Sequence, residues 1–334
     1  MSSSALILPA RRARLIIFDL HGVLVHRPAR VGRELSAAEV VAALRDLGVM
    51  IRFVTNASSK GPEEIVALLD RFGIPAKTDE VATAGQALAA YLREWHPGSR
   101  VLVIGQIGLR QLIADACRDR ITIDDAGEAN VVVVGRDPGL SEAKLTAAAR
   151  AARRGAVLLA SSVEATVPAA GCCEPGPGHT VSAVEDAMGR RAHVVGKPNP
   201  FILEQVLGLG RDVLRDALIV GDTAETDIRL GTAVGAITAL YPRPAALVPE
   251  SAPAADWILD RLEQILLFTG GRDGDDLARA EGICNFQQPD PCDPAPRTVD
   301  AILERGLPIS TTRRLLPDDL PEHGGCLLDQ SHHG

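Results

Sequence analysis

Four polar clusters in this 334-residue chain each lie at the end of a short run of apolar residues. They are Asp19 after residues 15–18, Thr55-Asn56 after 49–54, Lys197 after 192–195 and Asp222 after 217–220. A short apolar run bounded by turn residues is typical of a strand that is buried on both faces of a parallel sheet. Open α/β sheets bind ligands at the carboxyl ends of their strands. We therefore expect the four clusters to meet at one edge of a sheet.

The residue types in these clusters suit a phosphate ester held by a hard divalent cation. Asp19 and Asp222 offer the carboxylate oxygens that Mg²⁺ accepts at phosphate sites, where it keeps several waters. Lys197 and the hydroxyl of Thr55 would bind phosphate oxygens, and an ionised Asp19 is a competent nucleophile that forms an aspartyl-phosphate. Each cluster alone has a plainer interpretation, because Asp19 could cap the next element and Thr55-Asn56 could be turn residues. Their convergence is what favours catalysis.

The elements that must position these residues alternate between strand and helix patterns. The alternation runs over residues 14–83, restarts over 84–183 and resumes its first rhythm from 184. This order predicts an α/β fold with a Rossmann-like parallel-sheet core, residues 1–83 and 184–270, and an inserted α/β cap, residues 84–183. Residues 271–334 are rich in Pro and Gly, and we expect a poorly ordered tail there with one docked helix at 297–305.

Composition narrows the class of protein. The formal net charge of −8 argues against a nucleic-acid or anionic-membrane partner. No run approaches the ~18 apolar residues of a membrane span, and the apolar segment 5–8 is too short for a signal peptide. The six cysteines suggest no disulfide framework. The tail contains Cys284, Cys292, His323 and Cys326. The spacing of these residues matches no zinc module. We expect a cytoplasmic protein.

In order along the chain, the four clusters resemble the motifs of the haloacid dehalogenase (HAD)-like phosphatases. The matching segments are Phe18-Asp19-Leu20-His21-Gly22-Val23-Leu24, Val54-Thr55-Asn56, Gly196-Lys197-Pro198 and Gly221-Asp222-Thr223-Ala224-Glu225-Thr226-Asp227-Ile228. The long insertion after the third strand and the Thr226-Asp227 pair resemble the NagD-like, p-nitrophenyl-phosphatase branch. In that branch Asp227 would orient Lys197 or a metal-bound water. The resemblance covers about residues 14–262.

This resemblance implies a Mg²⁺-dependent phosphatase that hydrolyses a small phosphorylated metabolite, with a cap of a kind that often supports homodimers. It implies that Asp19 is the nucleophile and a metal ligand, and that Asp222 is the second carboxylate ligand. Lys197 would neutralise Asp19 and the phosphoryl group. Thr55 and Asn56 would hold phosphate oxygens.

The sequence departs from the family pattern at His21 and at residues 161–164. At the position of His21 the family usually has an aspartate, which protonates the leaving group and then deprotonates the attacking water. The resemblance therefore implies a role only for the backbone carbonyl of His21, as a metal ligand, and the acid–base role is open. An imidazole can donate when charged and accept when neutral, although Mg²⁺ and Lys197 nearby would disfavour its charged form. Residues Ser161-Ser162-Val163-Glu164 replace the usual Thr-Asn-x-Asp of the cap, so these positions do not identify the substrate.

Three functions therefore stay open. The first is a working phosphatase in which His21 is the acid–base group, or whose substrate needs little such help. The second transfers the phosphoryl group from Asp19 to another acceptor. The third is a binding or regulatory protein of the HAD fold that hydrolyses poorly. Retention of Asp19, Lys197 and Asp222 favours catalysis, since a non-catalytic protein has no physical need for all three together.

Overall fold

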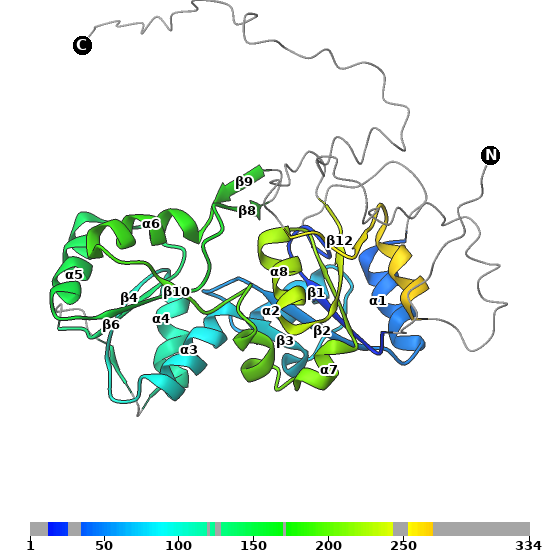
Figure 1. Ribbon diagram of the computed structural model, residues 1–334, viewed down its shortest axis with the longest axis horizontal. Helices are drawn as coiled ribbons and strands as arrows, with labels where there is room; N and C mark the ends of the chain where they lie inside the picture. Colours follow the sequence, from blue (N-terminus) through cyan, green and yellow to red (C-terminus); the bar gives the residue numbers. More distant parts are fainter. Residues whose placement is uncertain are drawn as a thin grey trace, which may run out of the picture.

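The computed structural model describes residues 13–25, 35–118, 121–123, 128–169, 172–242 and 253–269. The tail from residue 271, with its expected helix and cysteines, lies outside the described residues. Two parallel β-sheets lie side by side along the long axis of the molecule, each with helices packed around it (Figure 1). We call the larger sheet with its helices the core and the smaller sheet with its helices the cap. The predicted α/β fold with a parallel-sheet core and a cap is confirmed.

The core sheet has six strands, all parallel to their neighbours. In spatial order they are β13 (Trp257–Ile258), β12 (Ile237–Leu240), β11 (Ala217–Gly221), β1 (Leu15–Asp19), β2 (Met50–Thr55) and β3 (Val81–Thr83). The chain adds β2 and β3 on one side of β1 and later adds β11 to β13 on the other side, so the strand order reverses between β1 and β11. Such a reversal opens a crevice at the carboxyl ends of the two strands, where ligands bind in open α/β sheets.

Helices cover both faces of the core sheet, which explains the uninterrupted apolar run of β1. Ile16 and Phe18 pack on one face and Leu15 and Ile17 on the other, because successive side chains of a strand point to opposite faces. The first face packs against α1 (Ala37–Asp46), α2 (Pro62–Arg71) and the 3₁₀ helix η4 (Leu262–Phe268). The second packs against the π-helical turn η2 (Ile202–Val206), α7 (Arg211–Arg215) and α8 (Arg229–Val234). The short turn η1 (Thr78–Glu80) precedes β3, and the short turn η3 (Ala224–Ile228) follows β11.

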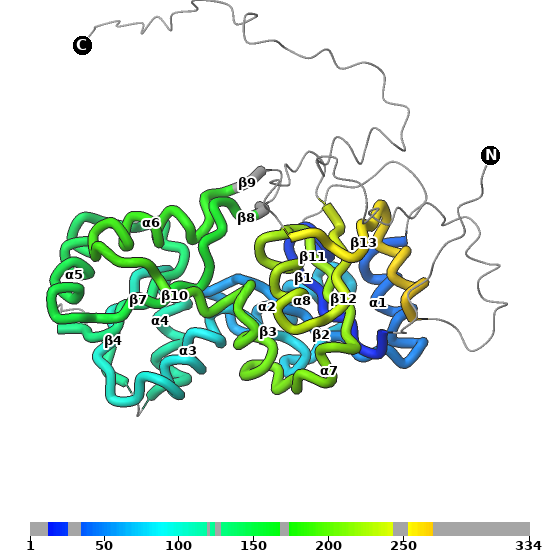
Figure 2. The backbone as a smooth tube through the Cα atoms, in the orientation of Figure 1, coloured from blue at the N-terminus to red at the C-terminus, as the bar shows by residue number. Residues whose placement is uncertain are grey.

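The cap is built around a second parallel sheet of five strands. In spatial order they are β10 (His193–Val194), β7 (Val157–Ala160), β6 (Val131–Val134), β4 (Arg100–Ile104) and β5 (Thr122–Ile123). One face packs against α3 (Ala84–Trp95) and α4 (Ile107–Ala116), and the other against α5 (Glu142–Arg153) and α6 (Pro177–Met188). Strands β8 (Thr166–Ala169) and β9 (Cys172–Pro175) form a separate antiparallel pair. In Figure 2 the cyan-to-green chain forms the cap, and the blue, yellow-green and yellow segments form the core.

One expectation about the sheets is wrong. The strand before Lys197 is predicted to join the core sheet, but β10 pairs in parallel with β7 of the cap, His193 with Leu159 and Val194 with Ala160. The reason is that α6 is the crossover helix of a β7–α6–β10 unit, and such a unit returns the chain to the sheet that it left. The domain boundaries at 83/84 and 183/184 stay predictions.

The chain passes from core to cap without a connecting loop. Thr83 is the last residue of β3, where it pairs with Thr55. It is also the N-cap of α3, and its hydroxyl accepts a hydrogen bond from the Gln86 N–H at 3.1 Å. The Thr83 side chain is fully buried. A core strand and a cap helix therefore share one residue.

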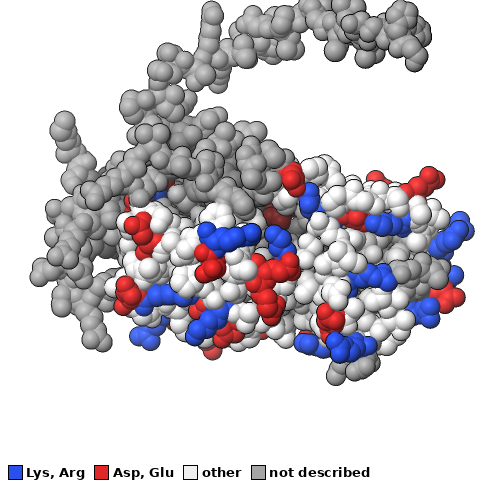
Figure 3. Space-filling view, turned by 180° about the vertical axis from the view of Figure 1, so that it is seen from behind, with Lys and Arg blue, Asp and Glu red and all other residues white. Residues whose placement is uncertain are grey.

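The described surface carries charges of both signs. On the face shown in Figure 3, acidic and basic side chains are interspersed with uncharged surface between them. Among the residues that the structure describes, no helix is long and apolar enough to cross a membrane. In the interior, four charged side chains lie together and form the site described next. They are Asp19, Lys197, Asp222 and Asp227.

Candidate active site

The carboxyl ends of β1, β2 and β11 meet at the edge where the core strand order reverses. Asp19 ends β1, Thr55 ends β2 and Asp222 follows β11. Lys197 arrives from the opposite side, on the loop after β10 of the cap. Asp19 and Asp222 are each 8% exposed and Lys197 is 3% exposed. The structure thus brings together the residues that the sequence singles out, but it draws them from two sheets instead of one.

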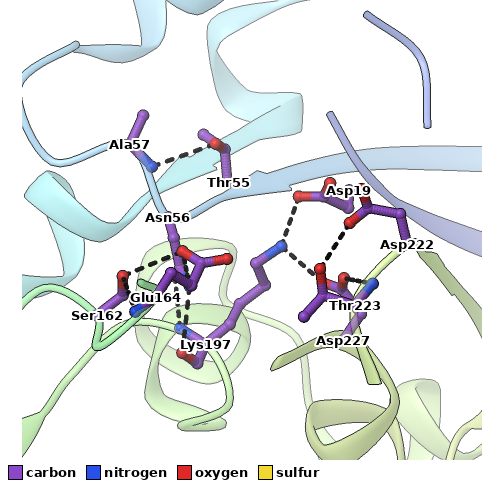
Figure 4. A network of polar contacts seen from close by, with 10 residues as sticks. All are labelled: Asp19, Thr55, Asn56, Ala57, Ser162, Glu164, Lys197, Asp222, Thr223 and Asp227. Atoms are coloured by element: carbon purple, nitrogen blue, oxygen red, sulfur yellow. Dashed lines mark hydrogen bonds and ion pairs between the residues drawn. The ribbon is translucent and has the colours of Figure 1, made fainter. Parts of the chain in front are cut away.

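Lys197 is the centre of the charge network at this edge (Figure 4). Its Nζ lies 2.5 Å from Oδ1 of Asp19 and 2.6 Å from Oδ1 of Asp227. Asp227 lies on η3, and its second oxygen accepts a hydrogen bond from the Thr223 N–H at 3.2 Å. Gly221 permits this packing, because a Cβ at that position would lie 2.1 Å from the Cβ of Asp227.

Burial and charge act against each other on these groups. Burial raises the pKa of Asp19 and that of Asp227, the latter to about 6, and the ammonium of Lys197 offsets only part of the rise. Burial alone would lower the pKa of Lys197, but Asp19, Asp227 and Glu164 outweigh it and hold that pKa above its ordinary value. Two buried carboxyl groups share one ammonium, so the lysine stays charged and the carboxyl pair carries excess negative charge.

Three carboxyl groups are placed to hold a cation. Asp19, Asp222 and Asp227 each offer an oxygen, and these oxygens lie within 4.8 Å of one another. Asp227 already uses both oxygens, on Lys197 and on the Thr223 N–H, whereas the Thr223 hydroxyl orients Asp222 from 2.9 Å. A set of a few carboxylate oxygens beside a cavity fits Mg²⁺. Asp19 and Asp222 are the members best placed to serve as its ligands.

His21 borders the same cavity as Asp19 and Asp222. It begins a tight turn in which the Gly22 N–H donates to the Val25 carbonyl at 2.9 Å. Gly22 has a φ of +88°, a conformation that glycine adopts without the steric cost of a Cβ. The acid–base role of the His21 side chain and the metal-ligand role of its carbonyl stay predictions.

Thr55 and Asn56 are buried beside the site. The Thr55 hydroxyl accepts a hydrogen bond from the Ala57 N–H at 3.2 Å. Asn56 joins two segments: its Oδ1 accepts from the Lys197 N–H at 2.8 Å, and its Nδ2 donates to the Lys197 carbonyl at 3.3 Å and to Glu164 Oε2 at 3.0 Å. The phosphate-binding role of Thr55 and Asn56 stays a prediction.

The cavity beside these residues has a volume of about 220 Å³, and sequence reasoning missed part of its lining. Among the missed residues are Lys60, Gln106 and Arg136. Arg136 is held in place by the Glu174 carboxylate at 2.6 Å and the Pro175 carbonyl at 2.8 Å. Gln106 and Arg136 each lie two residues past the end of a buried parallel strand, β4 and β6. Both residues therefore carry the same sequence signal as Asp19, a polar side chain at the carboxyl end of a buried strand.

Comparison with known proteins agrees with this arrangement. The haloacid dehalogenase-like hydrolase family matches residues 16–116, and the HAD-hydrolase-like family matches residues 194–265. The 5'-nucleotidase YutF of Bacillus subtilis is 33% identical over 226 residues, which are 67% of this chain and 85% of that protein. An acid sugar phosphatase of Staphylococcus epidermidis is 33% identical over 222 residues, 66% of this chain and 82% of that protein.

Solved structures share the fold. The p-nitrophenyl phosphatase from Archaeoglobus fulgidus superposes with a TM-score of 0.64 at 27% identity, covering 76% of this chain and 99% of that one. A glycerol phosphate phosphatase from Mycobacterium tuberculosis, in complex with magnesium, superposes with a TM-score of 0.63 at 27% identity, covering 76% and 77%. Because the relatives match over most of their length and both parts of the core are recognised, this chain belongs to the haloacid dehalogenase-like hydrolases, in their NagD-like, p-nitrophenyl-phosphatase branch, and is a phosphoric monoester hydrolase.

Proposed function

We propose that the protein is a Mg²⁺-dependent phosphatase that hydrolyses a small phosphorylated metabolite through an aspartyl-phosphate at Asp19. The observation that carries this proposal is the 2.5 Å contact between Asp19 and Lys197 at the point where the core strand order reverses. A buried carboxylate held there by a charged ammonium is placed to attack a phosphorus atom whose oxygens are neutralised by the same lysine.

In the first half-reaction an oxygen of Asp19 attacks phosphorus. The bond from phosphorus to the leaving oxygen breaks, and its electron pair stays on that oxygen. Lys197 neutralises the phosphoryl oxygens, while Asp227, 2.6 Å from the ammonium, keeps the lysine in position. The Thr55 hydroxyl and the backbone N–H of Asn56 hold the remaining phosphoryl oxygens, since the side-chain amide of Asn56 is already used on Lys197 and Glu164.

His21 is the proposed acid–base group. As imidazolium it gives a proton to the leaving oxygen, and as imidazole it takes one from the water that attacks the aspartyl-phosphate. That attack releases inorganic phosphate and returns Asp19 as a carboxylate. Mg²⁺, bound by Asp19, Asp222 and the His21 carbonyl, would supply further positive charge to the phosphoryl oxygens. The histidine at this position also sustains two alternatives, phosphoryl transfer to another acceptor and a binding protein with weak hydrolysis.

The cavity favours a small, hydroxylated leaving group. Its volume of about 220 Å³ is below the ~300–1,000 Å³ of pockets for drug-sized ligands. From the cap, Gln106 and Arg136 line it with groups that hydrogen-bond to hydroxyls. Among the described lining residues there is no Phe, Tyr or Trp on which a nucleobase could stack. A sugar or polyol phosphate is therefore preferred to a nucleotide.

A phosphate-release screen tests this proposal. The panel holds sugar phosphates, polyol phosphates, nucleoside monophosphates and cofactor phosphates, each assayed with Mg²⁺ and with EDTA. We expect turnover of at least one sugar or polyol phosphate, abolished by EDTA. Hydrolysis that persists in EDTA would contradict the metal requirement. Complete inactivity of Mg²⁺-loaded protein would favour the binding alternative, and turnover that needs an added alcohol would favour the transferase.

The expectations about location and partners stay predictions. They are a cytoplasmic protein, a homodimer, and no nucleic-acid or membrane partner. Light scattering on the purified protein, over a tenfold range of concentration, tests the homodimer directly.

A further inference from the structure

Glu164 has no catalytic part in the mechanism above, yet it contacts the site. It lies four residues past the end of β7 and lines the cavity. Its Oε2 accepts hydrogen bonds from Asn56 Nδ2 and from the Ser162 hydroxyl, both at 3.0 Å. Asn56 belongs to the core, so this side chain of the cap bonds to the core directly beside Lys197 (Figure 4).

The amide of Asn56 links Glu164 to Lys197. Its oxygen accepts the Lys197 N–H at 2.8 Å, and its nitrogen donates to the Lys197 carbonyl at 3.3 Å as well as to Glu164. An amide nitrogen has two N–H groups, so these contacts use both of them. Asn56 is 9% exposed, and removal of an acceptor would leave a buried donor unsatisfied. The backbone of Lys197 is therefore held by an amide whose orientation depends on Glu164.

The backbone around this link leaves little freedom. The Gly196 N–H donates to the Ser161 carbonyl at 3.1 Å. A Cβ on Gly196 would lie 2.2 Å from that carbonyl oxygen and 2.7 Å from Oδ1 of Asn56. On the far side of the loop, the Gly178 N–H donates to the Glu164 carbonyl at 2.9 Å. Residues 161–164 and 196–197 are thus in close backbone contact that a larger residue at Gly196 would disturb.

We propose that Glu164 is a positioning residue, which holds Asn56 and, through it, the Lys197 backbone, so that the ammonium meets Asp19. The inference rests on the proposed phosphatase function and adds that the cap takes part in the chemical step as well as in binding the leaving group. Glutamine can replace Glu164 in this role, because its amide oxygen accepts the same hydrogen bond from Asn56. Alanine and methionine cannot. If Glu164 were a charged ligand of the substrate, the activities of the variants would follow a different order, and Glu164→Gln would be as impaired as Glu164→Ala.

Steady-state kinetics separate the two roles. Glu164→Gln, Glu164→Ala and Glu164→Met are compared with the wild type on the best substrate of the screen. Glu142→Ala, an exposed acid in the first turn of α5, is the matched control. We expect Glu164→Ala and Glu164→Met to lower kcat by about 10²-fold with little change in KM, since a misplacement of about 1 Å costs that much. Glu164→Gln and Glu142→Ala should stay near the wild type. Methionine keeps the length of the side chain, so it serves if the alanine variant fails to fold.

Amide hydrogen exchange gives a readout that needs no activity. The Lys197 N–H donates to Asn56, so its exchange should accelerate in Glu164→Met and remain slow in Glu164→Gln. Unchanged kcat with a raised KM in Glu164→Met would overturn the proposal and make Glu164 a substrate ligand. Equal losses in the glutamine and methionine variants, with unchanged exchange, would also overturn it. If the wild type hydrolyses nothing, the phosphatase proposal fails, while the exchange comparison still decides whether Glu164 positions Lys197.

Discussion

The two sheets of this protein turn the same edge toward one cavity and supply different chemistry there. The core edge provides Asp19 and Asp222, at the ends of its two central strands. The cap edge provides Gln106 after β4 and Arg136 after β6, whereas Glu164 after β7 accepts a hydrogen bond from Asn56 of the core. One topological rule, ligand contact at the carboxyl ends of parallel strands, thus yields an attacking and metal-binding group on one side. On the other side it yields groups that can recognise a leaving group.

The difference between the edges is one of burial. Asp19 and Asp222 are each 8% exposed, whereas the side chains of Arg136 and its partner Glu174 are 25% and 48% exposed. Buried groups act through strong, fixed electrostatics, and exposed groups can change without unfolding the protein. Lys197 is the exception, because it follows a cap strand and is buried in the charge network of the core. Chemistry and specificity are therefore separable except at this lysine and at Glu164, the cap residue that we propose to position it.

The sharpest test of the core edge is Asp19→Asn. An amide cannot form the aspartyl-phosphate, so we expect turnover to fall by ~10⁴-fold or more. Release of p-nitrophenol in single-turnover and steady-state assays measures the loss, and circular dichroism checks that the variant is folded. Turnover within tenfold of the wild type would exclude the covalent mechanism.

A second test asks whether His21 belongs with the chemistry of the core edge. His21→Ala should lose about 10²–10⁴-fold on alkyl phosphates, the usual contribution of general acid–base catalysis. The loss on p-nitrophenyl phosphate should be smaller, because that leaving group departs without a proton. His21→Asp should retain activity. If His21→Ala equals the wild type on alkyl phosphates between pH 5 and 8, His21 is a spectator.

The third prediction concerns stability and follows from the excess negative charge of the core edge. Burial raises the pKa of Asp227 from 3.8 to about 6. Between these values the folded state binds more protons than the unfolded state, so the free energy of unfolding of the metal-free protein falls as pH rises. The fall attributable to Asp227 is of the order of a few kcal/mol, at about 1.4 kcal/mol per pKa unit.

Urea denaturation in EDTA between pH 4 and 6.5 measures this slope. Asp227→Asn is neutral at every pH, so the difference between wild type and variant isolates the contribution of that carboxyl group. The prediction fails if the free energy of unfolding of the wild type, relative to that of Asp227→Asn, increases with pH over this range. That result would show that the ion pair with Lys197 stabilises the charged form of Asp227 more than burial destabilises it.

The smallest effect is expected at the cap edge. Arg136→Ala should raise KM for the preferred substrate by about tenfold, the equivalent of one charge-assisted hydrogen bond, and leave kcat within a few-fold. Arg153→Ala, an exposed arginine of α5, is the control. A fall in kcat without a change in KM would break the division of labour between the two edges.

Sequence alone predicts the core edge well because its strands are buried on both faces. Continuous apolar runs such as 15–18 and 217–220 have few other interpretations, and the carboxylates follow them directly. The same pattern does not predict which of the two sheets the strand before Lys197 joins. A two-residue strand, His193–Val194, has no pattern that distinguishes one sheet from another, and the crossover helix α6 decides its partner. The bond between Asn56 and Glu164 joins residues 108 positions apart and leaves no local signal.

The residue shared by core and cap also limits how products leave. Thr83 ends β3 and caps α3, so no flexible linker separates the two units at that crossing. The return crossing at Val195 is likewise buried. A wide swing of the cap would break the pairing of Thr83 with Thr55 or its capping bond to Gln86. Phosphate and alcohol are therefore expected to escape through the mouth of the cavity, and a covalent staple between the two units should slow turnover little.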